Sequence, residues 1–156
     1  MRLFPIYLLI LLSLFSLSSC DSLRVFEENH PIDKGVWNTD TQKVFEMNME
    51  DTVSLCNIFL NVRHRGDYGY SNLYLFITTQ RPDGKMSVDT VECVLQDNEG
   101  KWLGNGIGDL YDNRLFFRTG VRFPVKGKYI FTFEQAMREK ELQHITDVGM
   151  RVERMP

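Results

Sequence analysis

The sequence has few of the residues from which metal sites are built. It contains three histidines and three cysteines, and no histidine has a second histidine or cysteine two or four positions after it. A zinc site combines three or four such ligands, so we predict no metal site. We expect His30, His64 and His144 to be solvated surface residues.

A basic surface is also lacking. Lys and Arg number 18 against 21 Asp and Glu, and they form no cluster. Binding to nucleic acid depends on basic patches that neutralise phosphates. We therefore predict no nucleic-acid partner.

Recognisable catalytic motifs are missing as well. There is no Gly-x-Ser-x-Gly motif, and the glycine-rich residues 104–108 lack the following helix that a nucleotide site needs. Carboxylates are plentiful, but their separation in space decides whether a pair can hydrolyse glycosides. We predict no enzyme and no cofactor, and a hydrolase built on scattered carboxylates is the alternative.

The one long apolar run lies near the start of the chain. Residues 3–17 are mainly Leu, Ile and Phe, with Arg2 before them and Leu-Ser-Ser-Cys ending at Cys20. The run is too short to span a bilayer and has the charge and small residues of a secretory signal. Its end is similar to the bacterial lipobox, so we predict a lipoprotein signal peptide over residues 1–19 and lipid attachment at Cys20. An ordinary signal peptide with an incidental cysteine is the alternative.

Lipidation decides where the mature chain resides. In the lipoprotein class this cysteine carries a diacylglyceryl thioether and usually an acyl chain such as palmitate on its nitrogen. One acyl chain binds a membrane only marginally, whereas two or three anchor a protein stably. We expect residues 20–156 to form a single lipid-anchored domain on a membrane surface.

Two further cysteines, Cys56 and Cys93, belong to the mature chain. A pair of cysteines outside the cytosol favours a disulfide. Apolar alternation places both on core-facing sides of strands, where a free cysteine behaves as a small hydrophobic residue. A disulfide and two buried thiols both remain open.

The mature chain alternates apolar and polar residues in short runs separated by Gly and Pro turns. This pattern predicts an all-β protein, an antiparallel β-sandwich of about eight strands. One short helix is expected over residues 135–141, where Glu134 and Arg138 have the i,i+4 spacing of an ion pair. The predicted strands cover residues 24–29, 43–49, 53–62, 73–79, 86–95, 115–123, 129–133 and 148–153.

Four aromatic residues lie beside predicted loops, where exposed rings could stack on sugars. The alternative is that they are half-buried caps of the core, which is common for aromatic residues near strand ends. This candidate binding surface comprises Trp37, Tyr68, Tyr70 and Trp102.

A longer pattern resembles the gliding-motility lipoprotein H family of the Bacteroidetes over nearly all of the mature chain. The pattern runs through Trp37, Asn61-x-Arg63, Tyr68-x-Tyr70-Ser71-Asn72, Asp89-Thr90-x-Glu92-Cys93, Trp102-Leu103-Gly104-x-Gly106-x-Gly108-Asp109, Gly127-x-Tyr129-x-Phe131, Gln135-Ala136-Met137-Arg138 and Asp147-Val148-Gly149-x-Arg151-x-Glu153. The resemblance implies a role in surface gliding and in the associated type IX secretion machinery. It brings no catalytic residues.

The residues of this pattern also have structural interpretations. The glycines at 104, 106 and 108 suit positive φ or close packing, and Arg63, Arg138 and Arg151 suit ion pairs with nearby carboxylates.

Residues and resemblance together predict a lipid-anchored, non-catalytic scaffold or binding subunit of the cell envelope. Its expected partners are the bacterial membrane, through acylated Cys20, and other gliding or secretion envelope proteins. A glycan-binding surface lipoprotein is the alternative. Asp21 would favour the inner membrane in enteric bacteria, but that rule need not hold in the Bacteroidetes, and we expect the outer membrane.

Overall fold

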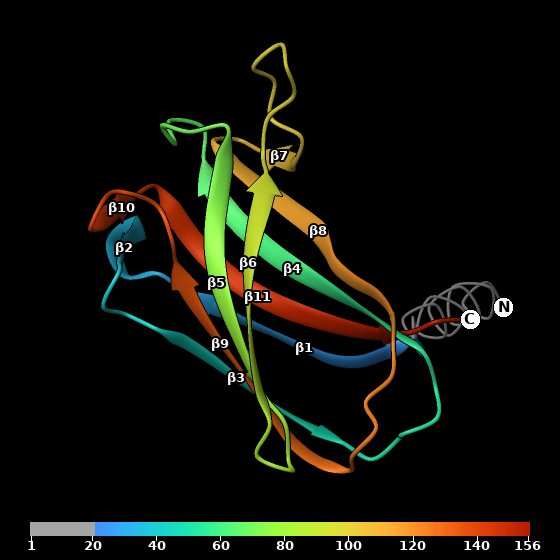
Figure 1. Ribbon diagram of the computed structural model, residues 1–156. Coiled ribbons are helices and arrows are strands. Elements are labelled where there is room, and N and C mark those ends of the chain that lie inside the picture. Colours follow the sequence, from blue (N-terminus) through green and yellow to red (C-terminus); the bar gives the residue numbers. More distant parts are fainter. Residues whose placement is uncertain (1–20) are drawn as a thin grey trace, which may run out of the picture.

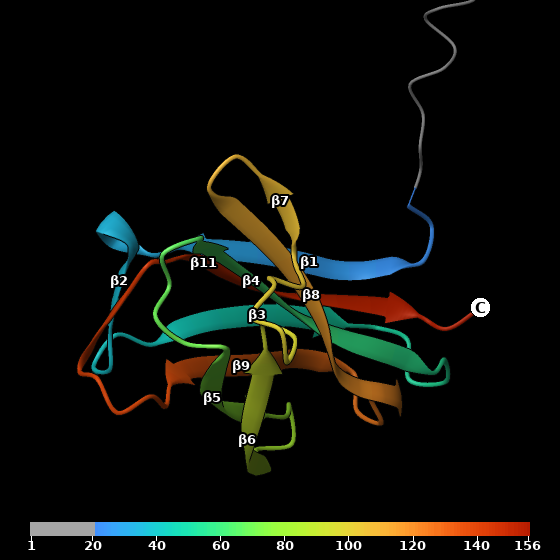
Figure 2. The same ribbon diagram turned by 90° about the horizontal axis from the view of Figure 1, so that it is seen from above.

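The computed structural model describes residues 21–156, so the predicted signal peptide and Cys20 lie outside the described residues. The chain forms two main antiparallel sheets that face each other, with β1 and β11 along one side and β5 and β6 along the other (Figure 2). The strands of β5 and β6 run steeply across those of β4 and β11 (Figure 1).

The larger sheet has five strands in the order β1-β11-β4-β8-β7. The first strand of the chain, β1, pairs with the last, β11, and Arg24 lies opposite Glu153. The strands of this sheet are β1 (Arg24–Pro31), β11 (Ile145–Arg154), β4 (Cys56–Arg65), β8 (Leu110–Val121) and β7 (Asn105–Ile107).

The second sheet has four strands in the order β3-β9-β5-β6, and a two-stranded ribbon joins β10 to β2. A short 3-10 turn, η2 (Asp33–Gly35), leads into β2. The strands are β3 (Lys43–Met49), β9 (Gly127–Gln135), β5 (Asn72–Gln80), β6 (Met86–Val94), β10 (Glu141–Gln143) and β2 (Val36–Asn38).

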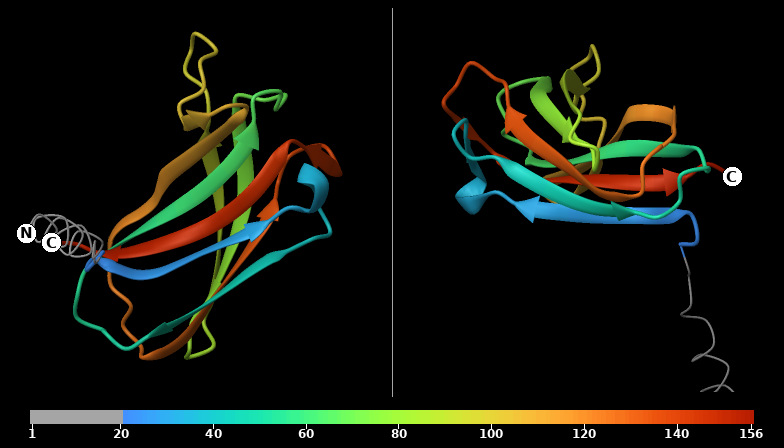
Figure 3. Two further views of the ribbon diagram at one scale, coloured as in Figure 1. Left: turned by 180° about the vertical axis from the view of Figure 1, so that it is seen from behind. Right: turned by 60° about the horizontal axis from the view of Figure 1, so that its bottom comes forward.

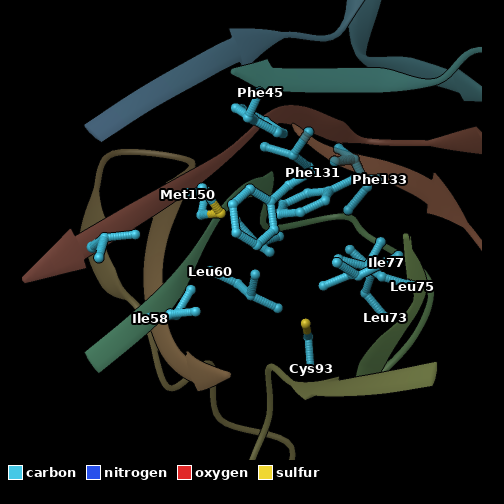
Figure 4. Close-up of a cluster of buried hydrophobic side chains, with 14 of the residues drawn as sticks. Phe45, Ile58, Leu60, Leu73, Leu75, Ile77, Cys93, Phe131, Phe133 and Met150 are labelled. Atoms are coloured by element: carbon cyan, nitrogen blue, oxygen red, sulfur yellow. The ribbon is translucent and has the colours of Figure 1, made fainter. Parts of the chain in front are cut away.

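The core lies between the two main sheets (Figure 4). Because successive strand residues point to opposite faces, alternate apolar residues turn inward. Leu73, Leu75 and Ile77 of β5 do so from one sheet, and Leu60 of β4 and Met150 of β11 do so from the other. The prediction of an antiparallel, all-β sandwich is confirmed, and the eight longer strands of the described chain match the number expected.

The prediction of a helix over residues 135–141 is wrong. Gln135 ends strand β9, and Glu141 already belongs to β10. The buried Gln135 amide organises the intervening turn, because its Nε2 donates to Glu139 O at 2.7 Å and its Oε1 accepts from Met137 N at 2.8 Å. Glu134 was the expected i,i+4 partner of Arg138, but its Oε1 instead accepts a hydrogen bond from Gln42.

A candidate binding face on the five-stranded sheet

Polar side chains gather on part of the outer face of the five-stranded sheet. In β4, the residues Ile58, Leu60 and Val62 are buried in the core. The alternate positions Asn61 and Arg63 therefore point to the other face. The same period applies to the neighbouring strands, so polar side chains from several strands meet there.

These side chains surround a hollow of about 580 Å³. Five strands contribute to it, namely β1, β4, β7, β8 and β11. All but one of its lining residues carry an amide, carboxylate or guanidinium group. The lining residues are Glu27, Asn29, Asn61, Val62, Arg63, Asn105, Asp112, Asn113, Arg114 and Asp147.

Arg63 links two walls of the hollow. Its Nε donates to Asp112 Oδ1 at 2.5 Å, and its Nη1 lies 3.6 Å from Asp147 Oδ2. The hydrogen bond with Asp112 raises the pKa of Arg63. The guanidinium is thus fixed between carboxylates of β8 and β11, as the sequence predicted for its ion pairing.

Asn61 and Arg114 build the adjacent wall against β1. Asn61 Nδ2 donates to Asn29 Oδ1 at 3.1 Å, and Arg114 Nη2 donates to Glu27 Oε1 at 3.2 Å. These contacts hold planar polar groups in place, and all four residues line the hollow. Such groups can form paired hydrogen bonds with a peptide backbone, an amide or a charged side chain.

Arg151 forms an ion-pair cluster next to the hollow. Its side chain is buried on the outer face of β11, where its guanidinium donates to Glu27 Oε2 and Glu153 Oε1, both at 2.5 Å, and to Asp21. Burial alone would raise the pKa of Glu27, but hydrogen bonding and charge from Arg151 and Arg114 hold that pKa below its usual value. The ion pairing predicted for Arg151 is therefore present, with three carboxylates.

Gly149 allows β1 to approach β11 at this place. A Cβ at position 149 would lie 2.6 Å from the backbone oxygen of Glu28 and would overlap the Asn29 side chain. Because Asn29 reaches Asn61 across this glycine, the glycine shapes the edge of the hollow.

The predicted roles of the other glycines, close packing or positive φ, are confirmed. A Cβ at Gly104 would lie 2.8 Å from Asp112 O, and one at Gly106 would lie 3.0 Å from the Tyr111 ring. Gly108 has a φ of 63°.

A second group of functional candidates lies at the far end of β4. The predicted Tyr68, Tyr70 and Trp102 come together there, with ring centroids 5.8 Å apart for the two tyrosines and 6.4 Å apart for Tyr68 and Trp102. Two unpredicted rings complete the cluster, because His64 lies 4.4 Å from Trp102 and stacks on Tyr111 at 5.6 Å.

His64 is not the solvated residue that the sequence suggested. It faces inward from β4 and is fully buried. Its Nδ1 lies 2.8 Å from Arg65 O, while its Nε2 has no hydrogen-bond partner among the described residues. Burial lowers the pKa of this histidine, which favours the neutral ring.

The four aromatic residues do not form the predicted stacking surface. Trp37 is 0% exposed and Tyr68 is 4% exposed, whereas Tyr70 is 37% exposed. Trp37 lies in β2 opposite Leu142, with its indole donating to Thr41 O at 2.8 Å. Two of the four rings belong to the core because short strands and loops cover them.

Cys56 and Cys93 are both buried free thiols. Cys56 begins β4, and Cys93 is the last residue but one of β6 in the other sheet, opposite Leu73. Tyr68, which lies near Cys93, contacts His64, eight residues along β4 from Cys56. At about 3.3 Å per residue, the two sulfurs lie at opposite ends of the sandwich, too far apart for the Cα separation of about 7 Å or less that a disulfide needs.

Within residues 21–156, no three His, Cys, Asp or Glu side chains are grouped to hold a metal ion. The charged groups lining the hollow are engaged in ion pairs. No helix in the described part of the chain is long and apolar enough to cross a membrane.

Sequence reasoning found only part of this face. Asn61 and Arg63 belong to the family pattern, and ion pairing of Arg63 and Arg151 was expected, but the neighbouring strands were unknown. The residues whose place at this site it missed are Glu27, Asn29, Asn105, Asp112, Asn113, Arg114 and Asp147.

Comparison with known proteins gives a consistent family match. The family model described as GldH lipoprotein matches residues 24–152. The chain is 38% identical to a gliding motility lipoprotein GldH homolog of Christiangramia forsetii over 144 residues, covering 88% of each chain. It is 34% identical to the gliding motility lipoprotein GldH of Flavobacterium johnsoniae over 152 residues, covering 93% of this chain and 94% of the relative.

Similarity to solved structures is weaker. Dimeric latent PorU from Porphyromonas gingivalis aligns over 88% of this chain and 14% of that chain, with 9% identity and a TM-score of 0.37. The Yersinia pseudotuberculosis-derived mitogen aligns over 82% of this chain and 85% of that chain, with 6% identity and a TM-score of 0.33.

Proposed function

Because the chain belongs to the GldH lipoprotein family, we propose that it is a non-catalytic binding subunit that holds other envelope proteins at a membrane surface. It is a gliding-motility lipoprotein and hence a lipid-anchored protein of the cell envelope. Its lipid-attachment residue in this proposal is Cys20, its membrane is the outer membrane, and its partners belong to the gliding and type IX secretion machinery.

The observation that carries this proposal is the polar hollow on the five-stranded sheet. Its side chains come from five strands and are held in place by ion pairs and amide hydrogen bonds. A rigid polar surface of this kind binds with little loss of side-chain entropy. Its partner is a polar protein segment that presents complementary amide, carboxylate or guanidinium groups.

Complementation of a deletion strain tests the proposal. The strain receives the wild-type gene, Cys20→Ala, Asn105→Trp or Asn98→Trp. Asn105 is exposed on the edge strand β7 and lines the hollow, so a tryptophan there would fill part of it. Asn98 is exposed in a turn that does not line the hollow and is the matched control.

Spreading motility and a quantitative secretome are the measurements, with protein abundance checked by immunoblot. We expect wild type and Asn98→Trp to restore both functions, and Cys20→Ala and Asn105→Trp to restore neither at normal abundance. Full restoration by Asn105→Trp would reject the hollow as the binding site. Full restoration by Cys20→Ala would reject the anchor.

A further inference from the structure

Exposed apolar side chains gather at one end of the sandwich. They come from three separate segments, the residues before β1, the β3–β4 loop and the residues after β11. Backbone hydrogen bonds of 2.8 Å join these segments, from Arg154 N to Leu23 O and from Met155 N to Leu55 O. We call this group the end patch, and it comprises Leu23, Val53, Leu55 and Met155.

The β3–β4 loop holds Val53 in a defined position. Asp51 Oδ1 accepts hydrogen bonds from Val53 N at 2.9 Å and Ser54 N at 3.0 Å, and Asp51 Oδ2 accepts from Ser54 Oγ at 2.6 Å. Arg154 Nε also donates to Asp51 Oδ2 at 3.3 Å. The loop is therefore a fixed turn that presents a valine side chain, 77% exposed, to the surroundings.

The same end of the molecule carries the attachment point. Asp21 is hydrogen-bonded to the buried Arg151 guanidinium, and Arg24 N donates to Asp21 O at 3.3 Å. Cys20 is the covalent neighbour of Asp21, and consecutive Cα atoms are only about 3.8 Å apart. No linker therefore separates the proposed lipid-bearing residue from the folded sheet. The strands β1, β4, β8 and β11 all converge on this end (Figure 3, left).

We propose that the end patch rests on the bilayer that holds the lipid anchor, so that the sandwich stands end-on at a fixed orientation. This inference rests on the proposed attachment at Cys20. The occupant of the patch is the lipid surface itself, because an anchor without a linker keeps these side chains at the headgroup level. Four apolar side chains add to interfacial binding, and a tethered contact forms at high effective concentration.

Charge at this end fits the same partner. The exposed side chains of Arg24 and Arg154 lie next to the patch, where their long stems can cover apolar surface while their guanidinium groups reach lipid phosphates. Two of the carboxylates nearby are paired, Asp51 with Arg154 and Asp21 with Arg151.

This orientation places the polar hollow away from the membrane. Cys56 of β4 lies opposite Arg154 at the membrane end, and the strand then runs outward. At about 3.3 Å per residue, Asn61 and Arg63 stand roughly 15–25 Å above that point. Envelope proteins can then reach the hollow without displacing lipid.

Depth-dependent quenching of an introduced tryptophan tests this orientation. The full lipoprotein is purified from membranes as the Val53→Trp and Ile107→Trp variants and reconstituted into phosphatidylethanolamine–phosphatidylglycerol vesicles with or without brominated phosphatidylcholine. Ile107 is the matched control, because it is an aliphatic residue of similar exposure, 80%, in β7. Wild-type emission is subtracted, and circular dichroism checks the fold of each variant.

We expect bromine to quench the added emission of Val53→Trp at least twofold more than that of Ile107→Trp. Equal or absent quenching of both variants in vesicle-bound protein would overturn the end-on orientation. A blue shift of the Val53→Trp emission without quenching would also overturn it, by showing that a second copy of the chain covers the patch. Failure of the wild-type protein to float with vesicles, like a Cys20→Ala control, would instead overturn the anchor on which the inference rests.

Discussion

The two ends of the sandwich bury polar residues in opposite ways. At the end where the described chain begins, Arg151 keeps its charge because three carboxylates surround it on the outer face of the sheet. At the other end, His64 lies inside the core between aromatic rings, and its Nε2 has no partner within the described chain.

This difference shows how one sheet can hold polar residues on both faces. A buried charge requires paired counter-charges, and the outer face supplies them from β1, β11 and the residue after Cys20. Around His64 the inner face offers only rings and backbone, and burial lowers the pKa of His64, which favours its neutral form. The two ends should therefore fail under different perturbations.

Removing the charge of Arg151 should have the largest effect. Arg151→Ala leaves Asp21, Glu27 and Glu153 close together without a counter-charge, and breaking a buried ion pair from one side costs about 3–5 kcal/mol. We expect a loss of about 3 kcal/mol in the free energy of unfolding, measured by guanidinium titration of the mature protein.

Arg154→Ala is the control for that variant. Arg154 lies on the same strand as Arg151, and its side chain forms an exposed pair with Asp51 of the β3–β4 loop. Exposed pairs contribute about 1 kcal/mol or less, so a similar loss in both variants would contradict a special role for the Arg151 cluster.

Gly149→Ala should have the next largest effect, confined to the same end. The new methyl group would push β1 away from β11, because it would lie 2.6 Å from Glu28 O. Overpacking of this kind costs about 1–3 kcal/mol. Thermal unfolding measures the loss, and near-ultraviolet circular dichroism should show the His64 ring cluster unchanged. Gly69→Ala, whose Cβ meets nothing within 4 Å, should stay close to wild type.

Mild acid should destabilise the His64 end of the sandwich before the Arg151 end. The folded pKa of His64 lies below its ordinary value of 6.5 because the ring is buried. Below pH 6.5 the unfolded chain therefore binds more protons than the folded one, and the free energy of unfolding falls as pH decreases, by up to about 1.4 kcal/mol per pH unit. Chemical denaturation at several pH values between about 7.5 and 5 measures this slope.

His64→Phe should flatten that slope, because it removes the buried ring that must take up the proton. Asp21 and Glu27, which pair with Arg151, lose their contribution to stability only at a lower pH. Because the pKa values of Asp21 and Glu27 are lowered in the folded state, their contribution is present above their ordinary values of 3.8 and 4.5 and is lost as pH falls below them. An unchanged slope in His64→Phe would show that another group titrates.

The smallest effect is expected from reductant, which should leave the free energy of unfolding unchanged because neither cysteine forms a disulfide. Each end of the sandwich holds one buried thiol, and burial raises the pKa of Cys93 to about 12. In the lipoprotein purified without reductant, we expect a thiol reagent to label neither cysteine in the folded state and both in guanidinium. No labelling in guanidinium would show that the two are oxidised.

Local pattern was enough to predict most of the strands. Alternation predicted β3 over its observed length, and the Pro-Asp-Gly turn before β6 is present, with Arg81 N bonded to Lys85 O and Gly84 at a φ of 81°. The three-residue strands β2, β7 and β10 were missed because such short segments have no measurable period. The helix over residues 135–141 was wrongly predicted because a buried glutamine amide, a tertiary feature, replaces the helical hydrogen bonds.

The candidate site was much less accessible to sequence reasoning. The hollow joins residues as distant as Glu27, Asn61 and Asp147. Which strands become neighbours depends on long-range pairing that periodicity does not encode. His64 was misassigned for the same reason, since the rings that enclose it come from separate segments of the chain.

The pairing of β1 with β11 also has a consequence for export. Arg24, near the start of the mature chain, is matched with Glu153, and β11 lies between β1 and the rest of its sheet. Forming such distant contacts is slow because a long loop must close first. The first strand to leave the translocation channel therefore has no place in the sheet until β11 has also emerged. The five-stranded sheet is therefore completed only after β11 has passed through the channel.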